Sequence, residues 1–176
     1  MDPRPLPVLH GPRITLRPAV PADAPALARI LRTPAVARWW PIADDAEVVA
    51  LCAGTDAALA VWVVLRAGAV VGLVQAWEES DPQYRHAGID IALDPTVHGR
   101  GLGPEAILLV AAHLRTDRGH HRITVDPNAA NTRAIRAYRS AGFREVGVTR
   151  SSEWDATLGR WTDGLLMELV VETART

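Results

Sequence analysis

The chain has 176 residues and a hydrophobic content of 48%, which suits one substantial core, and we expect a single domain over 1–176. Lys and Arg number 19 against 20 Asp and Glu, and a formal charge of −1 argues against nucleic acid and anionic membranes as partners. Cys52 is the single cysteine, and no Cys/His spacing is of the zinc type, so we expect neither a disulfide nor a structural metal. No apolar run reaches the roughly 18 residues that a membrane span requires, and we expect a cytoplasmic protein.

The first half of the chain predicts one strand, helices and an antiparallel hairpin. Residues 13–17 alternate polar and apolar side chains, as a half-buried strand does. Helical spacing of apolar residues follows over 21–34, where proline interrupts it, and a second helical stretch is expected over 46–53. Two valine-rich runs, 59–65 and 70–77, flank a glycine turn and predict the hairpin.

The middle of the chain predicts a strand, a glycine-rich loop and a helix. The polar segment 78–85 is expected to be a loop or a bulged connection, and 87–93 a strand with Asp90 on its less apolar side. A loop with three glycines follows at 98–103, and Pro104 begins an apolar helical stretch that reaches about residue 114.

The last third predicts another strand, a helix and a final pair of strands. The strand over 122–125 follows a helical crossover, so we expect it to lie parallel to the strand before that helix. The tail is expected to form strands over 145–150 and 162–171, around a loop that holds Trp154 and Trp161.

The loop His98-Gly99-Arg100-Gly101-Leu102-Gly103 lies between a strand and a helix, where backbone N–H groups and the helix dipole attract an anion. A phosphate-bearing ligand fits such a loop. The alternative is a purely steric role, because glycines also join strands to helices without binding anything. The loop lacks the Lys-Ser/Thr ending of a P-loop and the glycine spacing of a dinucleotide fingerprint.

In its downstream context this loop resembles that of the GNAT acetyltransferase superfamily, which reads Gln/Arg-x-x-Gly-x-Gly/Ala and holds the pyrophosphate of acetyl-CoA. His98 stands where that family usually has Gln or Arg. The family's later motif, Asn-x-x-Ala-x-x-x-Tyr before a Gly-Phe turn, is matched by 131–138 and then Gly142-Phe143. The resemblance implies acetyl-CoA as co-substrate and a mixed α/β fold. Its twisted, mostly antiparallel sheet has two splayed parallel central strands and is flanked by helices.

The sequence also resembles the aminoglycoside 6′-N-acetyltransferases of that superfamily. The similarity lies in Trp39-Trp40, in Gly88-Ile89-Asp90, and in Asp126-Pro127 followed by the motif that reaches Arg136. It runs over about 14–148, whereas 151–160 match poorly. This resemblance implies a cationic, aminoglycoside-like amine as acceptor.

Acetyl transfer to an amine requires a proton acceptor, donors for the developing oxyanion, and a proton for the thiolate. Asp90 and Asp126 are predicted to open into one cleft at the carboxyl end of the sheet, where they could accept the proton of the amine. The resemblance implies that they also hold the cationic substrate. Tyr138 is implied as proton donor to the CoA sulfur. The alternatives are a solvent-exposed Asp90, an ordinary turn acid before proline at Asp126, and a core aromatic at Tyr138.

The remaining candidates bind the two substrates. The expected acetyl-CoA residues are Ile91, Ala92 and Leu93 through backbone N–H groups, and His98, Gly99, Arg100, Gly101, Leu102, Gly103, Pro104, Asn131, Ala134 and Tyr138. The expected acceptor residues are Trp39, Trp40, Glu78, Glu79, Asp90 and Asp126. Alternatively, the tryptophans fill core volume, and Glu78 and Glu79 belong to a solvated loop. Glu105 near the phosphate site either turns away from the ligand or favours the helix N-terminus.

We therefore predict an acetyl-CoA-dependent N-acetyltransferase, monomeric or homodimeric, that acts on the 6′-amine of an aminoglycoside as a resistance enzyme. Two alternatives stay open. One is a GNAT enzyme for another amine, such as a protein N-terminus or a siderophore precursor. The other is a catalytically idle CoA-binding domain. We expect no metal, because His113, His120 and His121 lack partners for one.

Overall fold

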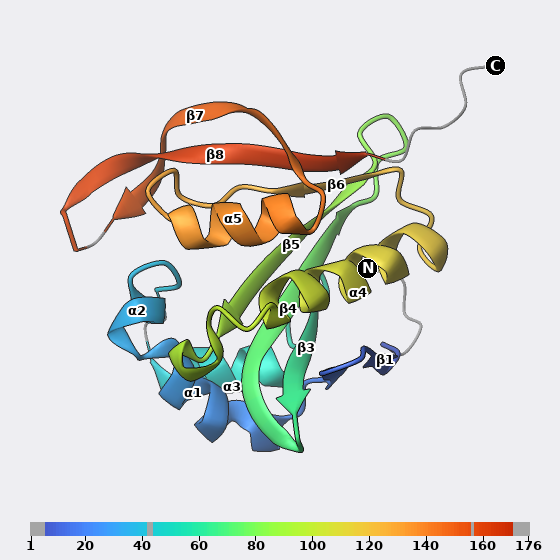
Figure 1. Cartoon of the computed structure of the whole chain (residues 1–176), viewed down its shortest axis with the longest axis vertical. Coiled ribbons are helices and arrows are strands. Elements are labelled where there is room, and N and C mark those ends of the chain that lie inside the picture. Colours follow the sequence, from blue (N-terminus) through green and yellow to red (C-terminus); the bar gives the residue numbers. More distant parts are fainter. Residues whose placement is uncertain (1–5, 42–43, 156, 171–176) are drawn as a thin grey trace.

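The computed structural model describes residues 6–41, 44–155 and 157–170. An eight-stranded sheet runs through the molecule in the order β1-β2-β3-β4-β5-β6-β8-β7 (Figure 1). The strands are β1 (Leu9–His10), β2 (Thr15–Pro18), β3 (Leu59–Arg66), β4 (Ala69–Glu79), β5 (His86–Leu93), β6 (Arg122–Val125), β7 (Arg144–Asp155) and β8 (Arg160–Val170). Only β5 and β6 pair in parallel among these neighbours. The expected fold class is confirmed.

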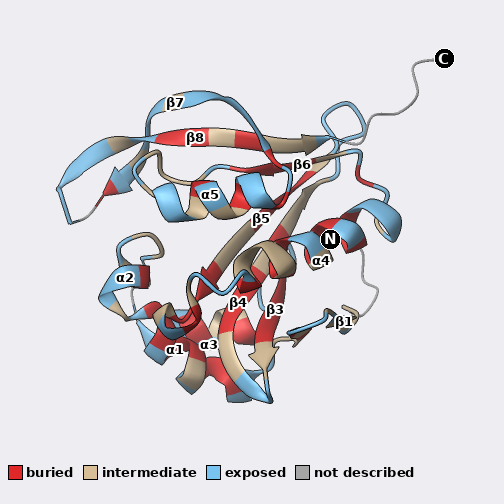
Figure 2. Ribbon diagram, in the orientation of Figure 1, coloured by how far each residue is buried: buried red, intermediate tan, exposed pale blue. Residues whose placement is uncertain are grey.

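Helices cover both faces of this sheet (Figure 1). They are α1 (Ala24–Leu31), α2 (Pro34–Ala37), α3 (Asp45–Ala53), α4 (Leu102–Thr116) and α5 (Thr132–Ser140), with short 3-10 turns η1 (Pro21–Asp23) and η2 (Pro95–Val97). Trp62 and Val64 of β3 pack in the cluster that includes α4 and α5, whereas Val63 packs with α1 and α3. Successive strand side chains point to opposite faces, so β3 serves both cores. Figure 2 shows these buried positions along the central strands and on the inner helix faces.

Short-range signals set several helix ends. Thr33 adopts an extended backbone before Pro34, and this separates α1 from α2. The carboxylate of Asp44 accepts the backbone N–H of Glu47 at 3.0 Å and caps α3. Asn131 caps α5 in the same way, accepting the N–H of Ala134 at 3.2 Å.

The parallel pair β5 and β6 is short and open at one end. Its register joins Ala87 to Ile123 and Gly88 to Thr124, and β5 then continues to Leu93 without pairing to β6. Figure 1 shows the two strands diverging beyond this point. Because the carboxyl ends of both strands lie at this divergence, it is where an open α/β sheet accommodates ligands.

Two segments that were expected to be loops are partly strand: residues 80–85 lie outside the strands, but the strands on both expected loops reach further than predicted. β4 extends through Glu79, because Glu78 and Glu79 pair with the first residues of β5. Trp154 and Trp161 face each other across the β7–β8 hairpin with ring centroids 5.6 Å apart. Such cross-strand aromatic contacts stabilise a hairpin and lengthen it beyond what alternation alone indicates. The expected strand end at position 171 lies outside the described residues.

Across 6–41, 44–155 and 157–170, no helix is both long and apolar enough to cross a bilayer.

Candidate active site

A cavity of about 640 Å³ opens where β5 and β6 diverge. Its walls come from α2, the ends of these strands, the glycine loop, the first turn of α4, and α5. It brings together most of the predicted residues, namely Trp39, Trp40, Asp90, Ile91, Ala92, Leu93, His98, Gly99, Gly101, Leu102, Gly103, Pro104, Asp126, Asn131, Ala134 and Tyr138. Arg100, Glu78 and Glu79 are not part of this lining.

The glycine loop has a backbone that requires glycine. Gly99 and Gly101 both have φ of +73°, a left-handed conformation that other residues adopt at a cost. A Cβ at Gly99 would meet nothing within 4 Å, which leaves that side of the loop open. Gly101 is the N-cap of α4 and offers no capping side chain, so the helix N-terminus remains available to an anion.

Arg13 supports this loop from outside. Its Nη1 donates to the carbonyl of Arg100 at 2.7 Å, and its Nη2 donates to the carbonyl of Gly101 at 3.0 Å. Its Nε donates to Glu105 at 2.6 Å, and its backbone N–H donates to the same carboxylate at 2.9 Å. Glu105 therefore points toward Arg13, outside the cavity lining, and it also stands in the first turn of α4, so both alternatives for this residue agree with the structure.

His98 uses both ring nitrogens within the protein. Nε2 lies 2.9 Å from the carbonyl oxygen of Leu93, and Nδ1 lies 2.7 Å from Nη1 of Arg133. The histidine thus links the end of β5 to the first turn of α5 at the edge of the cavity.

Backbone direction along β5 can be followed from two contacts. The carbonyl of Ala87 accepts a hydrogen bond from Thr124 of β6, and the carbonyl of Leu93 faces His98. The backbone N–H and C=O groups of odd-numbered β5 residues therefore point away from β4, toward the β6 side. Alternation then turns the N–H of Ile91 toward the cavity and that of Ala92 toward β4. Ile91 and Leu93 therefore suit an oxyanion better than Ala92 does.

Asp90 is a carboxylate with raised proton affinity. It accepts a hydrogen bond from Gln75 of β4 at 3.2 Å. Burial raises the pKa of Asp90, the hydrogen bond from Gln75 opposes this, and the negative charge of Asp126 raises the pKa further. A carboxylate of this kind can accept a proton from an ammonium group.

Glu153 is a third carboxylate in the cavity, and sequence reasoning did not find it. It lies on β7 near Asn128, which follows β6. Burial raises the pKa of Glu153, a hydrogen bond from Asn128 lowers it, and the charge of Asp126 raises it. Among the described residues, no cationic side chain forms an ion pair with Asp90, Asp126 or Glu153.

Tyr138 lies on α5 with only 5% of its surface exposed, and it lines the cavity. Its ring packs against Phe143 at a centroid distance of 5.7 Å. Burial raises the pKa of Tyr138, and the charges of Asp90 and Asp126 raise it further. The phenol therefore stays protonated at ordinary pH and keeps a proton that it can donate.

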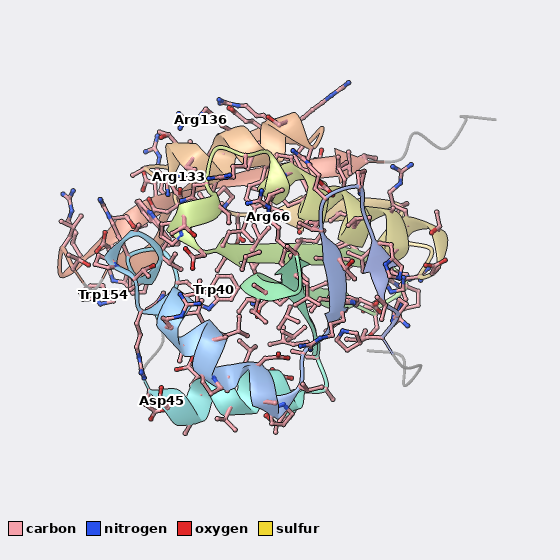
Figure 3. All side chains as sticks on the ribbon, turned by 60° about the horizontal axis from the view of Figure 1, so that its bottom comes forward. Trp40, Asp45, Arg66, Arg133, Arg136 and Trp154 are labelled. Carbon is pink, nitrogen blue, oxygen red and sulfur yellow. The ribbon has the colours of Figure 1, made fainter. Side chains whose placement is uncertain are left out.

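Trp39 and Trp40 follow α2 and line the cavity from the α2 side. Figure 3 labels Trp40. Both are half-buried, and Trp40 also packs against the core beside α1 and α3. The guanidinium of Arg38 lies over the Trp39 ring at 4.4 Å. The pair thus combines a core role with an aromatic wall, so both alternatives for these tryptophans apply in part.

Glu78 and Glu79 lie away from this wall, and we withdraw them as acceptor residues. The carboxylate of Glu78 pairs with Arg118 at 2.7 and 2.9 Å. Glu79 accepts the backbone N–H of Asp81 at 2.9 Å. The physical reason is their position, because they pair with the start of β5, whereas Asp90 is near its end.

Residues 13–144 match the family described as the acetyltransferase (GNAT) domain. The chain belongs to the GNAT acetyltransferase family. It is therefore an acyltransferase, as predicted.

This GNAT acetyltransferase has curated and structural relatives. It is 26% identical over 162 residues to aminoglycoside N(6′)-acetyltransferase type 1 from Klebsiella pneumoniae, covering 81% of this chain and 80% of the relative. The solved structure of the aminoglycoside acetyltransferase AAC(6′)-Ib with coenzyme A and kanamycin matches with a TM-score of 0.73 at 23% identity. The match covers 89% of this chain and 94% of that one. A ribosomal-protein-S5-alanine acetyltransferase from Vibrio fischeri has a TM-score of 0.82 at 14% identity, with coverage of 97% and 100%. At these identities the two structures show the fold alone.

The glycine loop of this GNAT acetyltransferase fits the pyrophosphate of acetyl-CoA. Its open side at Gly99 and the uncapped start of α4 would offer N–H groups to phosphate oxygens. A Cβ added to Gly103 would lie 3.7 Å from a methyl of Leu93 and 3.9 Å from the methyl of Ala137. The first turn of α4 therefore lies close to β5 and α5.

Proposed function

We propose that this N-acetyltransferase acetylates the 6′-amine of an aminoglycoside. The observation that carries the proposal is the convergence of Asp90, Asp126 and Glu153 on one cavity beside the glycine loop, with Trp39 and Trp40 on its other wall. A polyamine sugar offers several ammonium groups to such carboxylates and ring faces to such aromatics. The 26% identical Klebsiella pneumoniae relative supports the same substrate class.

Each chemical step has a residue of this chain. Asp90 accepts a proton from the substrate ammonium, and the neutral amine nitrogen then attacks the thioester carbonyl carbon. The N–H groups of Ile91 and Leu93 stabilise the oxyanion that develops. As the C–S bond breaks, Tyr138 donates its phenolic proton to the thiolate, and the attacking nitrogen loses its second proton to water. Solvent then returns a proton to Tyr138 and takes the proton from Asp90.

Asp126 and Glu153 take a different part. Both line the same cavity as Asp90, and their charges suit other ammonium groups of the acceptor. The charge of Asp126 also raises the pKa of Asp90, so that Asp90 holds a proton more firmly.

The test measures thiol release from acetyl-CoA with two aminoglycosides that differ only in an amine or a hydroxyl at the 6′ position. We expect turnover of the amine and at least about 10²-fold less of the hydroxyl, because the nucleophile is missing. Spermidine and a peptide with an N-terminal alanine serve as comparisons. Turnover of the peptide without turnover of any aminoglycoside would overturn the proposal and favour a protein N-terminus as acceptor.

A further inference from the structure

Both ring nitrogens of His98 form hydrogen bonds within the protein, so neither is free to donate a hydrogen bond to a ligand. The carbonyl of Leu93 can only accept a hydrogen bond, so Nε2 of His98 must carry its proton. The guanidinium of Arg133 can only donate, so Nδ1 must present a lone pair. The two contacts, at 2.9 and 2.7 Å, define one neutral tautomer of the ring.

Arg133 is held at one nitrogen and remains open at the others. It lies in the first turn of α5, is exposed, and lines the same cavity as Gly99 and Gly101. Figure 3 labels Arg133. Its only hydrogen bond to a described side chain is the one to His98. The other guanidinium donors suit a phosphate, which arginine binds with two parallel hydrogen bonds.

We propose that His98 is a positioning residue that holds the Arg133 guanidinium beside the glycine loop, where Arg133 pairs with a phosphate of acetyl-CoA. This rests on the proposed cofactor site. It gives His98 a defined task at a position where its own ring nitrogens are already occupied.

The charges around His98 agree with this arrangement. Burial lowers the pKa of His98, the nearby charge of Arg133 lowers it too, and the Leu93 carbonyl and Asp94 oppose these effects. The ring therefore stays neutral at neutral pH and keeps the lone pair that Arg133 needs.

The test is a double-mutant cycle on CoA affinity, measured by calorimetry with the full chain and without an acceptor. We expect Arg133→Ala to weaken CoA binding about tenfold, as loss of a charge-assisted hydrogen bond does. His98→Ala should weaken it about threefold to tenfold alone, and less than about twofold when Arg133→Ala is already present. His98→Gln should restore most of the affinity, because one amide both donates and accepts.

Arg136→Ala is the matched control. Arg136 also lies on α5 and lines the cavity, yet it has no hydrogen bond to His98 among the described residues. Its effect on CoA affinity should therefore add to that of His98→Ala without coupling. Repeating the titrations with dephospho-CoA identifies the phosphate: an unchanged loss in Arg133→Ala assigns the pyrophosphate, and a vanished loss assigns the 3′-phosphate.

Three results would overturn the inference. They are full CoA affinity in Arg133→Ala, additive losses in the His98 and Arg133 pair, and a His98→Gln variant as weak as His98→Ala. Absence of CoA binding by the unaltered protein would overturn the proposed function as well, whereas these three results leave it standing.

Discussion

The proton affinity of Asp90 depends on Asp126, which directly follows the last residue of β6. Burial and the charge of Asp126 both raise the pKa of Asp90, so the acid limb of kcat/KM should lie above the ordinary carboxyl range near 4. Asp126→Asn removes a like charge, which lowers the pKa of Asp90 and moves this limb to lower pH. Measuring kcat/KM from about pH 5 to 8 with a 6′-amino aminoglycoside checks the shift.

Glu153→Gln is the control for this shift, because Glu153 is not among the groups that change the pKa of Asp90. Its acid limb should stay in place even where the KM of the acceptor rises. A limb that moves equally in both variants would contradict the specific pairing of Asp90 with Asp126.

Tyr138 is expected to matter through its hydroxyl rather than its ring. Tyr138→Phe keeps the packing against Phe143 and removes the proton donor, so kcat should fall about 10²-fold with little change in CoA affinity. Steady-state kinetics and calorimetry measure the two effects. Tyr84→Phe is the matched control, because Tyr84 is 69% exposed and outside the cavity lining. A kcat within a factor of two of the unaltered enzyme would remove Tyr138 from the mechanism.

At the scale of elements, Arg13 joins the turn before β2 to the glycine loop and to α4. Arg13→Ala should weaken CoA binding up to about fivefold, since the side chain is 53% exposed and such surface contacts contribute at most about 1 kcal/mol. Arg13→Lys should behave alike, because one ammonium cannot reach both carbonyls and Glu105.

The control for Arg13 is Arg139→Ala, which removes an arginine of similar exposure that pairs with Glu145 outside the cavity. It should leave CoA affinity unchanged in calorimetry. Equal weakening in the Arg139 variant would mean that the Arg13 effect does not act through the loop.

For the whole molecule, Asp23 should make stability depend on pH. Its carboxylate accepts two hydrogen bonds from Arg17 at 2.7 and 2.6 Å and caps the backbone N–H of Val20. The Arg17 hydrogen bonds, and to a lesser degree the cap, hold the pKa of Asp23 below its ordinary value. Because folding lowers this pKa, the stabilisation is present above about pH 4 and is lost as pH falls through the folded-state value.

Asp23→Asn should therefore lower the free energy of unfolding by about 1–3 kcal/mol at pH 7, with a smaller difference near pH 3. Denaturant unfolding at the two pH values measures this. Asp45→Asn is the control, because its pair with Arg32 is exposed on both sides and should change stability by less than about 1 kcal/mol. A pH-independent loss in Asp23→Asn would show that the ion pair is not its cause.

Local pattern determined much of this protein without any structure. Alternation in β2 and β5, the valine-rich runs of β3 and β4, the proline break at Pro34, the Asn131 cap and the glycine loop are set by neighbours within a few residues. They could therefore be predicted along the chain. The motifs at 98–103 and 131–138 likewise indicated an acetyl-CoA site. Assignment of 1–176 to one domain and the oligomeric state stay predictions.

Only the tertiary structure decided which side chains share the cavity. Glu153 reaches the cavity through the register of β7 against β8. Glu78 lies outside it because it pairs with the start of β5, where Arg118, forty positions away, binds its carboxylate. The side-chain partners of His98 and Glu105, Arg133 and Arg13, are likewise 35 and 92 positions distant in sequence. Sequence periodicity reports which face of an element is apolar, whereas ion pairs and strand register depend on how distant elements meet, and a single sequence does not carry that information locally.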